Sequence, residues 1–490
     1  MGDTDVSDTS TGAVETEHTS HILEPSATPL FCLITLGCAK NEVDSNHMRA
    51  LLAASRLRET GDPAAADVVI INTCSFITEA TEESLDAIFE TLSLENFKQG
   101  RARLVVAGCM PSRYGEELKK ELFEAAAFVT VSDEERIVEI CYEVLGIPWD
   151  HEQDERFHGM ATCDHFDGKT LALSARRIID GPWAYVKISD GCSRQCSYCT
   201  IPQIRGPYHS RPFEAIALEV EELVAGGVCE IILIGQDTSV WGSDLCCKDD
   251  NKQYPQAKTL ACLLSTLATT HPTVWFRVMY LQPQGITDAL LETIARHRNI
   301  CDYLDIPLQH VNARILQEMN RSGSAEEFYT LLSRIRSILP DATIRTTLIA
   351  GFPGETQAEA RELEDFVNAA DFDYVGVFAY SQEDGTPAGK RVDQVPLRTR
   401  KARQQRLRDA ADKLGFRRAE RKFGTMQEVL ICGVDEEGVY GRIHAQAPDI
   451  DGVTHIQGAQ IDPDDCPMII RVEITASNCY DLYANLSTNR

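Results

Sequence analysis

The sequence predicts an α/β protein of three parts: an N-terminal parallel α/β domain, an open (βα)6 partial barrel and a small C-terminal antiparallel β-barrel. Short apolar runs alternate with amphipathic stretches, which is typical of parallel strands joined by helices on the faces of a sheet. The alternation is interrupted after residue 148 and resumes at Tyr185, so we expect two such domains. Beyond residue 423, strand-like runs follow one another without helices between them.

The N-terminal domain is expected at 29–148. Its predicted strands are Phe31–Leu36, Val68–Asn72, Leu104–Ala107 and Phe128–Val131. Residues 1–28 hold six acidic side chains and no Lys or Arg, the composition of a disordered acidic tail. The stretch 149–177, most of which belongs to a Pro- and His-containing segment around Pro148–Lys169, is expected to link this domain to the next.

The second domain is expected at 178–416, with a surface loop inserted at Gly242–Lys258. Its strands are predicted to begin at Tyr185 and to continue with Ile231–Ile234, Val274–Met279, Tyr303–Ile306, Ile344–Ile349 and Tyr374–Phe378. Six βα units are too few for a full eight-stranded barrel, which favours an open one. A basic helix, Arg398–Lys422, leads into the last domain, 417–488. Its predicted strands are Met426–Cys432, Val439–His444, Val453–Ile456 and Ile469–Ala476.

The composition predicts a cytoplasmic protein rather than a secreted or membrane protein. The N-terminal stretch lacks the basic and apolar regions of a secretory signal, and no apolar run approaches the roughly 20 residues of a membrane span. In a cytoplasmic protein, the 17 cysteines are expected to be thiols and metal ligands rather than parts of disulfides. A formal charge of -28 argues against a broad phosphate-binding surface and favours a basic protein partner.

Three cysteines within eight residues, Cys192, Cys196 and Cys199, carry the strongest chemical signal. A C-x3-C-x2-C loop supplies three thiolates, and thiolates hold iron–sulfur clusters or zinc. On a cubane cluster, three protein ligands leave one iron open to bind a substrate. A closed zinc site requires a fourth ligand, for which His209 is the nearby candidate; this alternative and that of three unrelated buried cysteines remain open.

A second set, Cys38, Cys74 and Cys109, is dispersed, yet each residue follows a predicted strand of the first domain. The carboxyl ends of parallel strands share one edge of the sheet, so the three can converge there. Gly37 and Gly108 would let the backbone approach a bulky inorganic group. Cysteine is also a common buried residue, so the alternative is that these are core side chains.

The triad Cys192, Cys196 and Cys199 and the preceding strand Trp183–Ile188 resemble the signature of the radical S-adenosylmethionine (SAM) superfamily. The stretches Leu36–Ser45, Asn72–Ile77 and Val106–Met110 resemble the N-terminal domain of the methylthiotransferases, whose third domain is a TRAM domain. The resemblance covers roughly 30–488. It implies two 4Fe-4S clusters, with Cys192, Cys196 and Cys199 holding the SAM-binding one and Cys38, Cys74 and Cys109 an auxiliary one that carries the sulfur to be transferred. It also implies an external electron donor.

Within this family, several stretches resemble the branch that modifies an aspartate of small-subunit ribosomal protein S-twelve. They are Gly37–Asn41, with Lys40 where the bacterial tRNA branch tends to have Met, Tyr303–His310 and Val377–Ala388. From Phe423 onward, eleven acidic residues stand against three basic ones, a formal balance of -8. Such a domain suits a basic ribosomal protein better than tRNA phosphates, so nucleic acid is not expected as the direct substrate.

The expected reaction is addition of a methylthio group to the β-carbon of that aspartate. The alternatives are the same chemistry on tRNA adenosine, and a non-catalytic iron–sulfur redox protein. For the acidic residues of the last domain, the alternative is that they only confer solubility.

Four further residues are candidates for contacting SAM: Gln236, Asp237, Arg345 and Gly351. Gln236 and Asp237 end a strand of the barrel, at the edge where such folds keep their sites, or they cap the following loop. Arg345 is a candidate partner for the SAM carboxylate. Gly351 lies in a Gly/Pro turn that suits a backbone close to a cofactor, and Glu355 there could equally favour a first helical turn. The basic loop Arg205–Arg211 could contact SAM, substrate or a carboxylate elsewhere in the chain.

Overall fold

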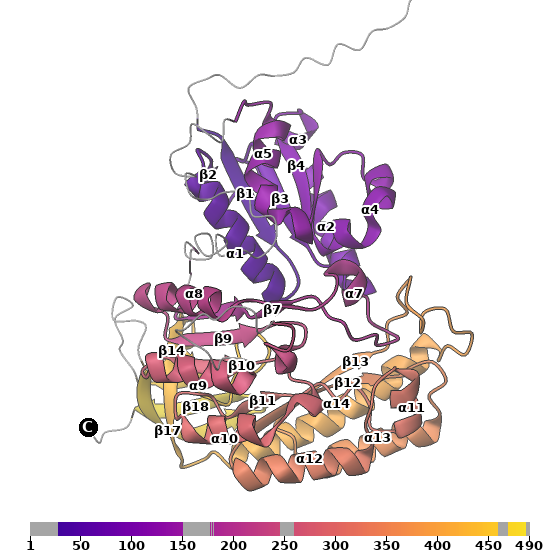
Figure 1. Ribbon diagram of the computed structural model, residues 1–490, viewed down its shortest axis with the longest axis vertical. Coiled ribbons are helices and arrows are strands. Elements are labelled where there is room, and N and C mark those ends of the chain that lie inside the picture. Colours follow the sequence, from indigo (N-terminus) through magenta and orange to yellow (C-terminus); the bar gives the residue numbers. More distant parts are fainter. Residues whose placement is uncertain are drawn as a thin grey trace, which may run out of the picture.

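The computed structural model describes residues 28–149, 177, 179, 181–245, 259–458 and 469–486 (Figure 1). The expected acidic tail before residue 28, nearly all of the linker and most of the insertion at Gly242–Lys258 lie outside the described residues.

The N-terminal domain is a five-stranded sheet with helices on both faces, as the alternation predicted. All four strand pairs are parallel, in the order β2-β1-β3-β4-β5. The strands are β1 (Leu30–Thr35), β2 (Arg58–Glu59), β3 (Val68–Thr73), β4 (Arg103–Gly108) and β5 (Ala127–Thr130). The helices are α1 (Ala39–Ala54), α2 (Thr78–Leu92), α3 (Glu95–Lys98), α4 (Cys109–Glu121) and α5 (Ile137–Leu145). Only β2, a two-residue edge strand, was not expected.

The second domain is an open barrel of six parallel strands in sequence order. The three-stranded sheets β6-β9-β10 and β11-β12-β13 are joined by a bridge between Phe276 and Ile300. The strands are β6 (Trp183–Lys187), β9 (Glu230–Ile234), β10 (Trp275–Val278), β11 (Tyr303–Asp305), β12 (Thr343–Ala350) and β13 (Tyr374–Ala379). A short hairpin pairs β7 (Ser189–Asp190) with β8 (His209–Ser210).

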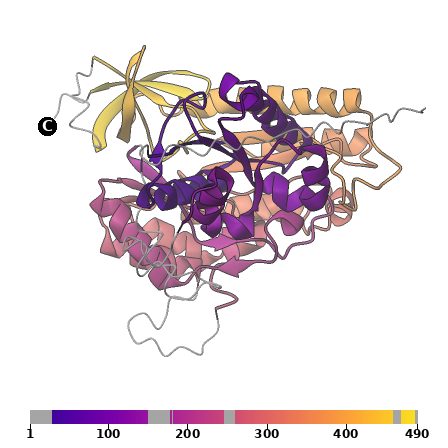
Figure 2. The same cartoon turned by 90° about the horizontal axis from the view of Figure 1, so that it is seen from above.

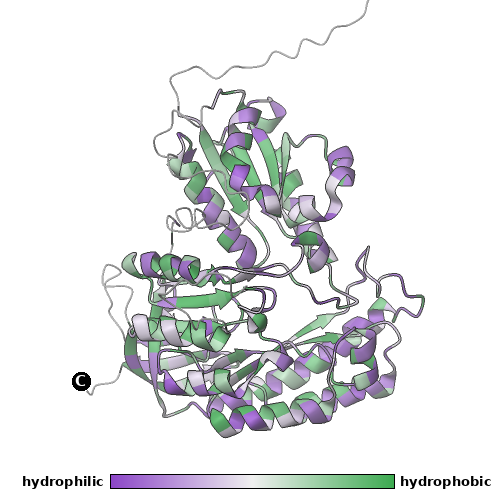
Figure 3. Cartoon of the chain, viewed as in Figure 1, coloured by the Kyte–Doolittle hydropathy of each residue, from purple (hydrophilic) through white to green (hydrophobic). Residues whose placement is uncertain are grey.

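Helices cover the outer face of this barrel, and their apolar sides pack on the strands. They are α8 (Phe213–Ala225), α9 (Leu260–Thr270), α10 (Asp288–Arg296), α11 (Ala313–Glu318), α12 (Ala325–Ile338), α13 (Gln357–Ala369) and α14 (Leu397–Glu420). The short helix α7 (Ile201–Ile204) instead lies against α4 of the N-terminal domain. Figure 3 shows their alternation of apolar and polar residues, and green strands between them. Helix α13 begins with a capping box formed by Thr356 and Glu359, which satisfies the first free N–H groups of the helix.

The C-terminal domain is a closed barrel in the order β14-β15-β16-β18-β17, visible in yellow in Figure 2. Its strands are β14 (Met426–Asp435), β15 (Gly438–Arg442), β16 (Thr454–Gln457), β17 (Ile469–Asn478) and β18 (Asp481–Leu486). β18 was not expected, because its polar residues interrupt the alternation. It pairs parallel to β16, whereas the other four pairs are antiparallel. Among the described residues, no helix has the length and apolarity that spanning a membrane requires.

The inner face of the open barrel is closed by side chains from the other two domains. Apolar residues Val43 of α1 and Leu430 and Ala447 of the C-terminal domain belong to one cluster with Tyr185 and Ile232 of the barrel. Deeper inside, the Glu230 carboxylate accepts a hydrogen bond from Arg277 at 2.8 Å and forms an ion pair with Arg442 of β15 at 2.6 Å. Both contacts are buried, and the one with Arg442 fixes the C-terminal domain on the barrel.

Replacing Glu230 should therefore destabilise the protein strongly. Glu230→Ala leaves the buried guanidinium groups of Arg277 and Arg442 without a counter-charge, which costs about 3–5 kcal/mol. Denaturant unfolding measures this loss. Glu116→Ala, which removes an exposed carboxylate paired with Lys119, is the control and should change stability far less, because solvent screens an exposed ion pair. Equal effects of the two substitutions would contradict the structural role of Glu230.

Buried His310 should make stability pH-dependent. Its Nδ1 accepts hydrogen bonds from the N–H groups of Val311 and Asn312, and burial lowers its pKa to about 3. The unfolded chain takes up this proton near pH 6.5, so the stabilising contribution is present above pH 6.5 and is lost as pH falls toward 3. We expect up to about 1.4 kcal/mol per pH unit in unfolding experiments between pH 6 and 5. His310→Asn should show a shallower decline.

Candidate iron–sulfur and S-adenosylmethionine site

The three cysteines of the N-terminal domain meet at one edge of its sheet. Cys74 directly follows β3, Cys109 directly follows β4, and Cys38 precedes α1 as its N-cap. The side chains of Cys74 and Cys109 share a hydrogen bond, and a Cβ placed on Gly37 would lie 2.8 Å from the Cys74 Sγ. Gly37 has a φ of +97°, so both its conformation and its lack of a side chain let Cys38 and Cys74 approach.

Asn41, in the first turn of α1, holds this edge together. Its amide donates hydrogen bonds to the carbonyls of Leu36 at 3.0 Å and Thr73 at 2.8 Å, which are the last residues before two of the cysteine turns. Its Oδ1 accepts from the Cys109 thiol at 3.5 Å and from Arg205 of the barrel at 2.9 Å. One side chain therefore connects the N-terminal cysteines to the second domain.

The second triad lies on the loop after β7, at the carboxyl edge of the barrel. The N–H of Cys192 donates to the Gly206 carbonyl at 3.1 Å, and the N–H of Cys199 to that of Cys196 at 3.1 Å. Between them, Ser197 is fixed by its N–H to Met319 at 3.0 Å and by its hydroxyl to Glu318 at 2.8 Å. The loop is thus anchored at both ends and in the middle.

Arg321 is a further residue of this loop environment that the sequence did not indicate. Its guanidinium donates to the Cys196 Sγ at 3.8 Å and to Gln282 and Pro307 oxygens at 2.8 Å each. Hydrogen bonds to cysteine sulfurs tune the reduction potential of a bound cluster. It follows helix α11 in a turn with no motif, so only the folded chain brings it to Cys196.

The thiols at both edges fit iron–sulfur clusters. Burial raises the pKa of Cys192, and that of Cys199 to about 12, so a thiolate there needs a cationic partner such as iron. Among the described residues, no three His, Cys, Asp or Glu side chains converge on a single metal ion. A cubane cluster does not require this, because each thiolate binds its own iron. His209, the fourth ligand in the zinc alternative, is exposed in β8.

Gln236 and Asp237 follow β9 at the same edge as the second triad. The Oε1 of Gln236 is buried and has no hydrogen-bond partner among the described residues, as expected for a side chain that binds a polar ligand. Asp237 pairs with Arg194 of the cysteine loop at 2.6 Å and accepts from the Ser239 hydroxyl at 2.5 Å. A contact of either residue with SAM remains a prediction, and Asp237 has in addition a role in holding the loop.

Arg345 and Gly351 already have protein partners. Arg345 points into the barrel and pairs with Asp305 at 3.1 Å and with Asp451 of the C-terminal domain at 3.6 Å. Gly351, with a φ of +79°, packs on Arg400 of α14, where a Cβ would come within 2.6 Å of the Arg400 Cγ. Helix packing therefore accounts for this glycine by itself, and contacts of both residues with SAM stay predictions.

In the basic loop, Arg205 and Arg211 contact carboxylates of the chain itself, as one of the alternatives predicted. Arg205 pairs with Asp44 of α1 at 2.8 Å and with Asp190 at 3.3 Å, and Arg211 pairs with Glu219 at 2.6 Å. Glu355 caps a turn, since it accepts from the N–H groups of Gly351 and Phe352.

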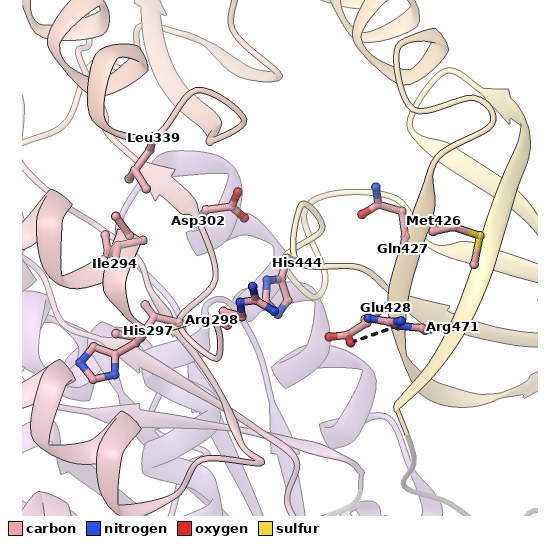
Figure 4. Close-up of a pocket in the computed structure, with 12 residues that line it drawn as sticks. Ile294, His297, Arg298, Asp302, Leu339, Met426, Gln427, Glu428, His444 and Arg471 are labelled. Atoms are coloured by element: carbon pink, nitrogen blue, oxygen red, sulfur yellow. Dashed lines mark ion pairs between the residues drawn. The ribbon is translucent and has the colours of Figure 1, made fainter. Parts of the chain in front are cut away.

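A cavity of about 500 Å³ lies elsewhere, between the barrel and the C-terminal domain (Figure 4). His297, Arg298 and Asp302 precede β11, so this cavity is at the amino ends of the strands, opposite the cysteine-bearing edge. Glu428 and Arg471 on its far wall pair at 3.6 Å. Its distance along the strands from both triads separates it from the candidate chemistry.

Family models match three consecutive parts of the chain. They are the uncharacterized protein family UPF0004 over 31–130, the radical SAM superfamily over 186–367 and the TRAM domain over 423–486. The chain is 42% identical over 459 residues to the ribosomal protein uS12 methylthiotransferase RimO of Geobacter sulfurreducens, covering 93% of this chain and 98% of that protein. The RimO of Trichlorobacter lovleyi is 41% identical, with 93% and 97% covered.

Among solved structures, the radical SAM methyltransferase TsrM from Kitasatospora setae, with cobalamin and a 4Fe-4S cluster bound, has a TM-score of 0.51 at 14% identity. The match covers 78% of this chain and 85% of that one, and it supports the fold.

An open parallel barrel with a three-cysteine loop at its carboxyl edge, preceded by a sheet with three more cysteines, defines a radical SAM enzyme that uses SAM and two 4Fe-4S clusters. The relatives narrow the class further. The chain belongs to the RimO family of ribosomal protein uS12 methylthiotransferases.

Each triad should account for half of the bound iron. Anaerobically reconstituted protein should hold about eight irons per chain, because each cubane contains four. Replacing Cys192, Cys196 and Cys199 together by Ala should leave about four irons and abolish SAM cleavage. Replacing Cys38, Cys74 and Cys109 should also leave about four irons but spare SAM cleavage. Iron analysis and detection of 5′-deoxyadenosine measure both. Full iron content in the second variant would disprove the auxiliary site.

Proposed function

We propose that this protein adds a methylthio group to the β-carbon of an aspartate in ribosomal protein uS12. One observation carries the proposal: the two cysteine-bearing edges face each other. The Thr200 hydroxyl, directly after Cys199, donates to the carbonyl of Phe76, two residues after Cys74, at 3.1 Å. A sulfur held by the N-terminal triad is therefore next to the loop of the SAM-binding triad.

The protein residues bind, orient and shield, while the bound clusters and SAM supply the hydrogen-abstracting radical and the methylthio group. Gly37 and Asn41 hold the N-terminal cysteines in place, and Arg194 and Arg321 hold the second loop. An aspartate Cβ–H is not acidic enough for general base catalysis alone, which is why the site needs such cofactors. An external electron donor and a cytoplasmic location, where ribosomal proteins are made, are parts of the proposal.

The exposed carboxylates of the C-terminal domain favour a basic protein as the substrate. Asp435, Glu436, Glu437 and Glu473 are exposed, and Glu428 is half exposed. Not all acidic residues of this domain are available: Asp451 is buried and pairs with Arg345 and Tyr303 inside the barrel. Since the domain closes the barrel, surface substitutions test its role more cleanly than removal of the whole domain.

The substrate is tested by mass spectrometry after incubation of the reconstituted enzyme with purified uS12 or with bulk tRNA. We expect the mass of a methylthio group on an aspartate of uS12 and none on tRNA adenosine. The variant with Cys38, Cys74 and Cys109 replaced by Ala is the control and should leave uS12 unmodified. Methylthiolated adenosine together with unchanged uS12 would refute the proposal.

Neutralising the exposed carboxylates Asp435, Glu436 and Glu437 by Asn and Gln should weaken binding to uS12. Exposed charges contribute roughly 0.2–1 kcal/mol each, so the three together should cost up to about tenfold in affinity. The loss should be largest at low salt and shrink as salt screens the charges. Titrations of labelled uS12 measure it. Glu292, Glu326 and Glu327, exposed on α10 and α12, are the matched control and should have little effect when changed to Gln.

A further inference from the structure

Lys40, two residues after Cys38, is a buried cation without an anion. Its side chain is 7% exposed, and its Nζ lies 2.9 Å from the centroid of the Tyr280 ring. Within the described part of the chain, the Nζ has no hydrogen-bond acceptor and no carboxylate within 4.0 Å. The ring face stabilises the charge, but it leaves the three N–H donors of the ammonium without acceptors.

Neighbouring cations differ from Lys40, because each already has a carboxylate. Lys187 pairs with Asp44 and Asp190, Arg205 with the same two, and Arg345 with Asp305. The carboxylates nearest to Lys40 are therefore engaged elsewhere. A buried charge is retained only at a cost unless it is paired, so an unpaired ammonium indicates an anion that is not part of this chain.

Tyr280 is held in an unusual conformation beneath this ammonium. It lies two residues beyond the end of β10, at the carboxyl edge of the barrel, and has a φ of +63°. Its N–H donates to Asp305 at 3.0 Å, which fixes the turn. Non-glycine residues rarely adopt positive φ, and such strain is kept where the placement of the side chain matters.

The contact between Lys40 and Tyr280 joins the two cysteine-bearing edges, because Lys40 follows Cys38 by two residues and Tyr280 lies at the carboxyl edge of the barrel, which also carries the loop of Cys192, Cys196 and Cys199. An anion bound beside this contact would lie at the junction of the two edges. The Cβ of an aspartate is separated from its carboxylate by a single bond.

We propose that Lys40 binds the side-chain carboxylate of the aspartate that is modified, and so distinguishes it from neutral side chains. This inference rests on the proposed function and adds the residue that recognises the reacting side chain. Asparagine has the same shape but no charge, so it would leave the ammonium unpaired. Tyr280 acts as a positioning residue that orients Lys40.

The test compares two peptides that span the modified segment of uS12, one with the natural aspartate and one with asparagine in its place. Anisotropy of the labelled peptides measures their binding to cluster-reconstituted enzyme without SAM. The wild type should bind the aspartate peptide about tenfold more tightly, as a charge-assisted hydrogen bond predicts. In Lys40→Met the ratio should fall to about one through weaker binding of the aspartate peptide only. Lys40→Arg should retain a preference for aspartate.

Lys40→Gln keeps the polarity but not the charge and should behave like Lys40→Met; it replaces that variant if the methionine side chain prevents cluster assembly. Lys119→Met, which removes an exposed lysine paired with Glu116, is the matched control and should keep the wild-type ratio. An undiminished preference for the aspartate peptide in Lys40→Met or Lys40→Gln, while the wild type modifies uS12, would overturn the proposed role of Lys40. The proposed function would not be affected. Equally weakened binding of both peptides would also overturn this role and would indicate that Lys40 interacts with the cluster thiolates instead. A wild type that neither binds nor modifies the aspartate peptide would overturn the proposed function as well.

Discussion

A buried set of ion pairs between the N-terminal sheet and the barrel determines the geometry on which the site depends. Asp44 of α1, with a 3% exposed side chain, binds both Lys187 at the end of β6 and Arg205 beyond the second triad. Arg205 also reaches Asn41, which touches the Cys109 thiol. Buried pairs of this kind add little net stability, because desolvation offsets the attraction, but a displaced partner leaves an uncompensated charge. The two cysteine-bearing edges are thus held in one relative position.

A second junction works by the same principle on the other side of the domains. Glu383, in the segment after β13, forms a buried ion pair with Arg113 of α4 at 2.8 Å and accepts from the N–H of Thr78 at the start of α2 at 2.8 Å. Both helices follow strands that lead to cysteines. Together with the Asp44 pairs, this clamps the N-terminal sheet at two points, so it cannot pivot about one contact. A reaction that passes a group between two sites requires such fixed placement, because small displacements of reacting atoms cost much rate.

The sequence allowed the strands, the helices and the cysteine edges to be predicted, because these depend on local periodicity. Each of Cys38, Cys74 and Cys109 follows a strand, and parallel strands share an edge, so their convergence needs no knowledge of tertiary contacts. The contacts of charged side chains could not be predicted. Arg205 is separated by 161 residues from Asp44, and nothing in a basic loop shows that its arginine will be buried. Likewise β18, with Asp481 and Asn485, lacks the alternation that marks a strand, and closure of the barrel by β16 determines its pairing.

The burial of the N-terminal triad is uneven, and this bears on how the site works. Cys74 and Cys109 are buried, whereas Cys38 is exposed. Lys40 follows Cys38 by two residues and contacts Tyr280 of the barrel, so the unpaired cation follows the exposed cysteine of the triad in the sequence. In the proposed role of Lys40, the aspartate carboxylate is bound close to the cysteine that is open to solvent, and a side chain without a negative charge leaves the ammonium unpaired. Specificity would then depend on an interaction at the site itself as well as on the acidic surface of the C-terminal domain.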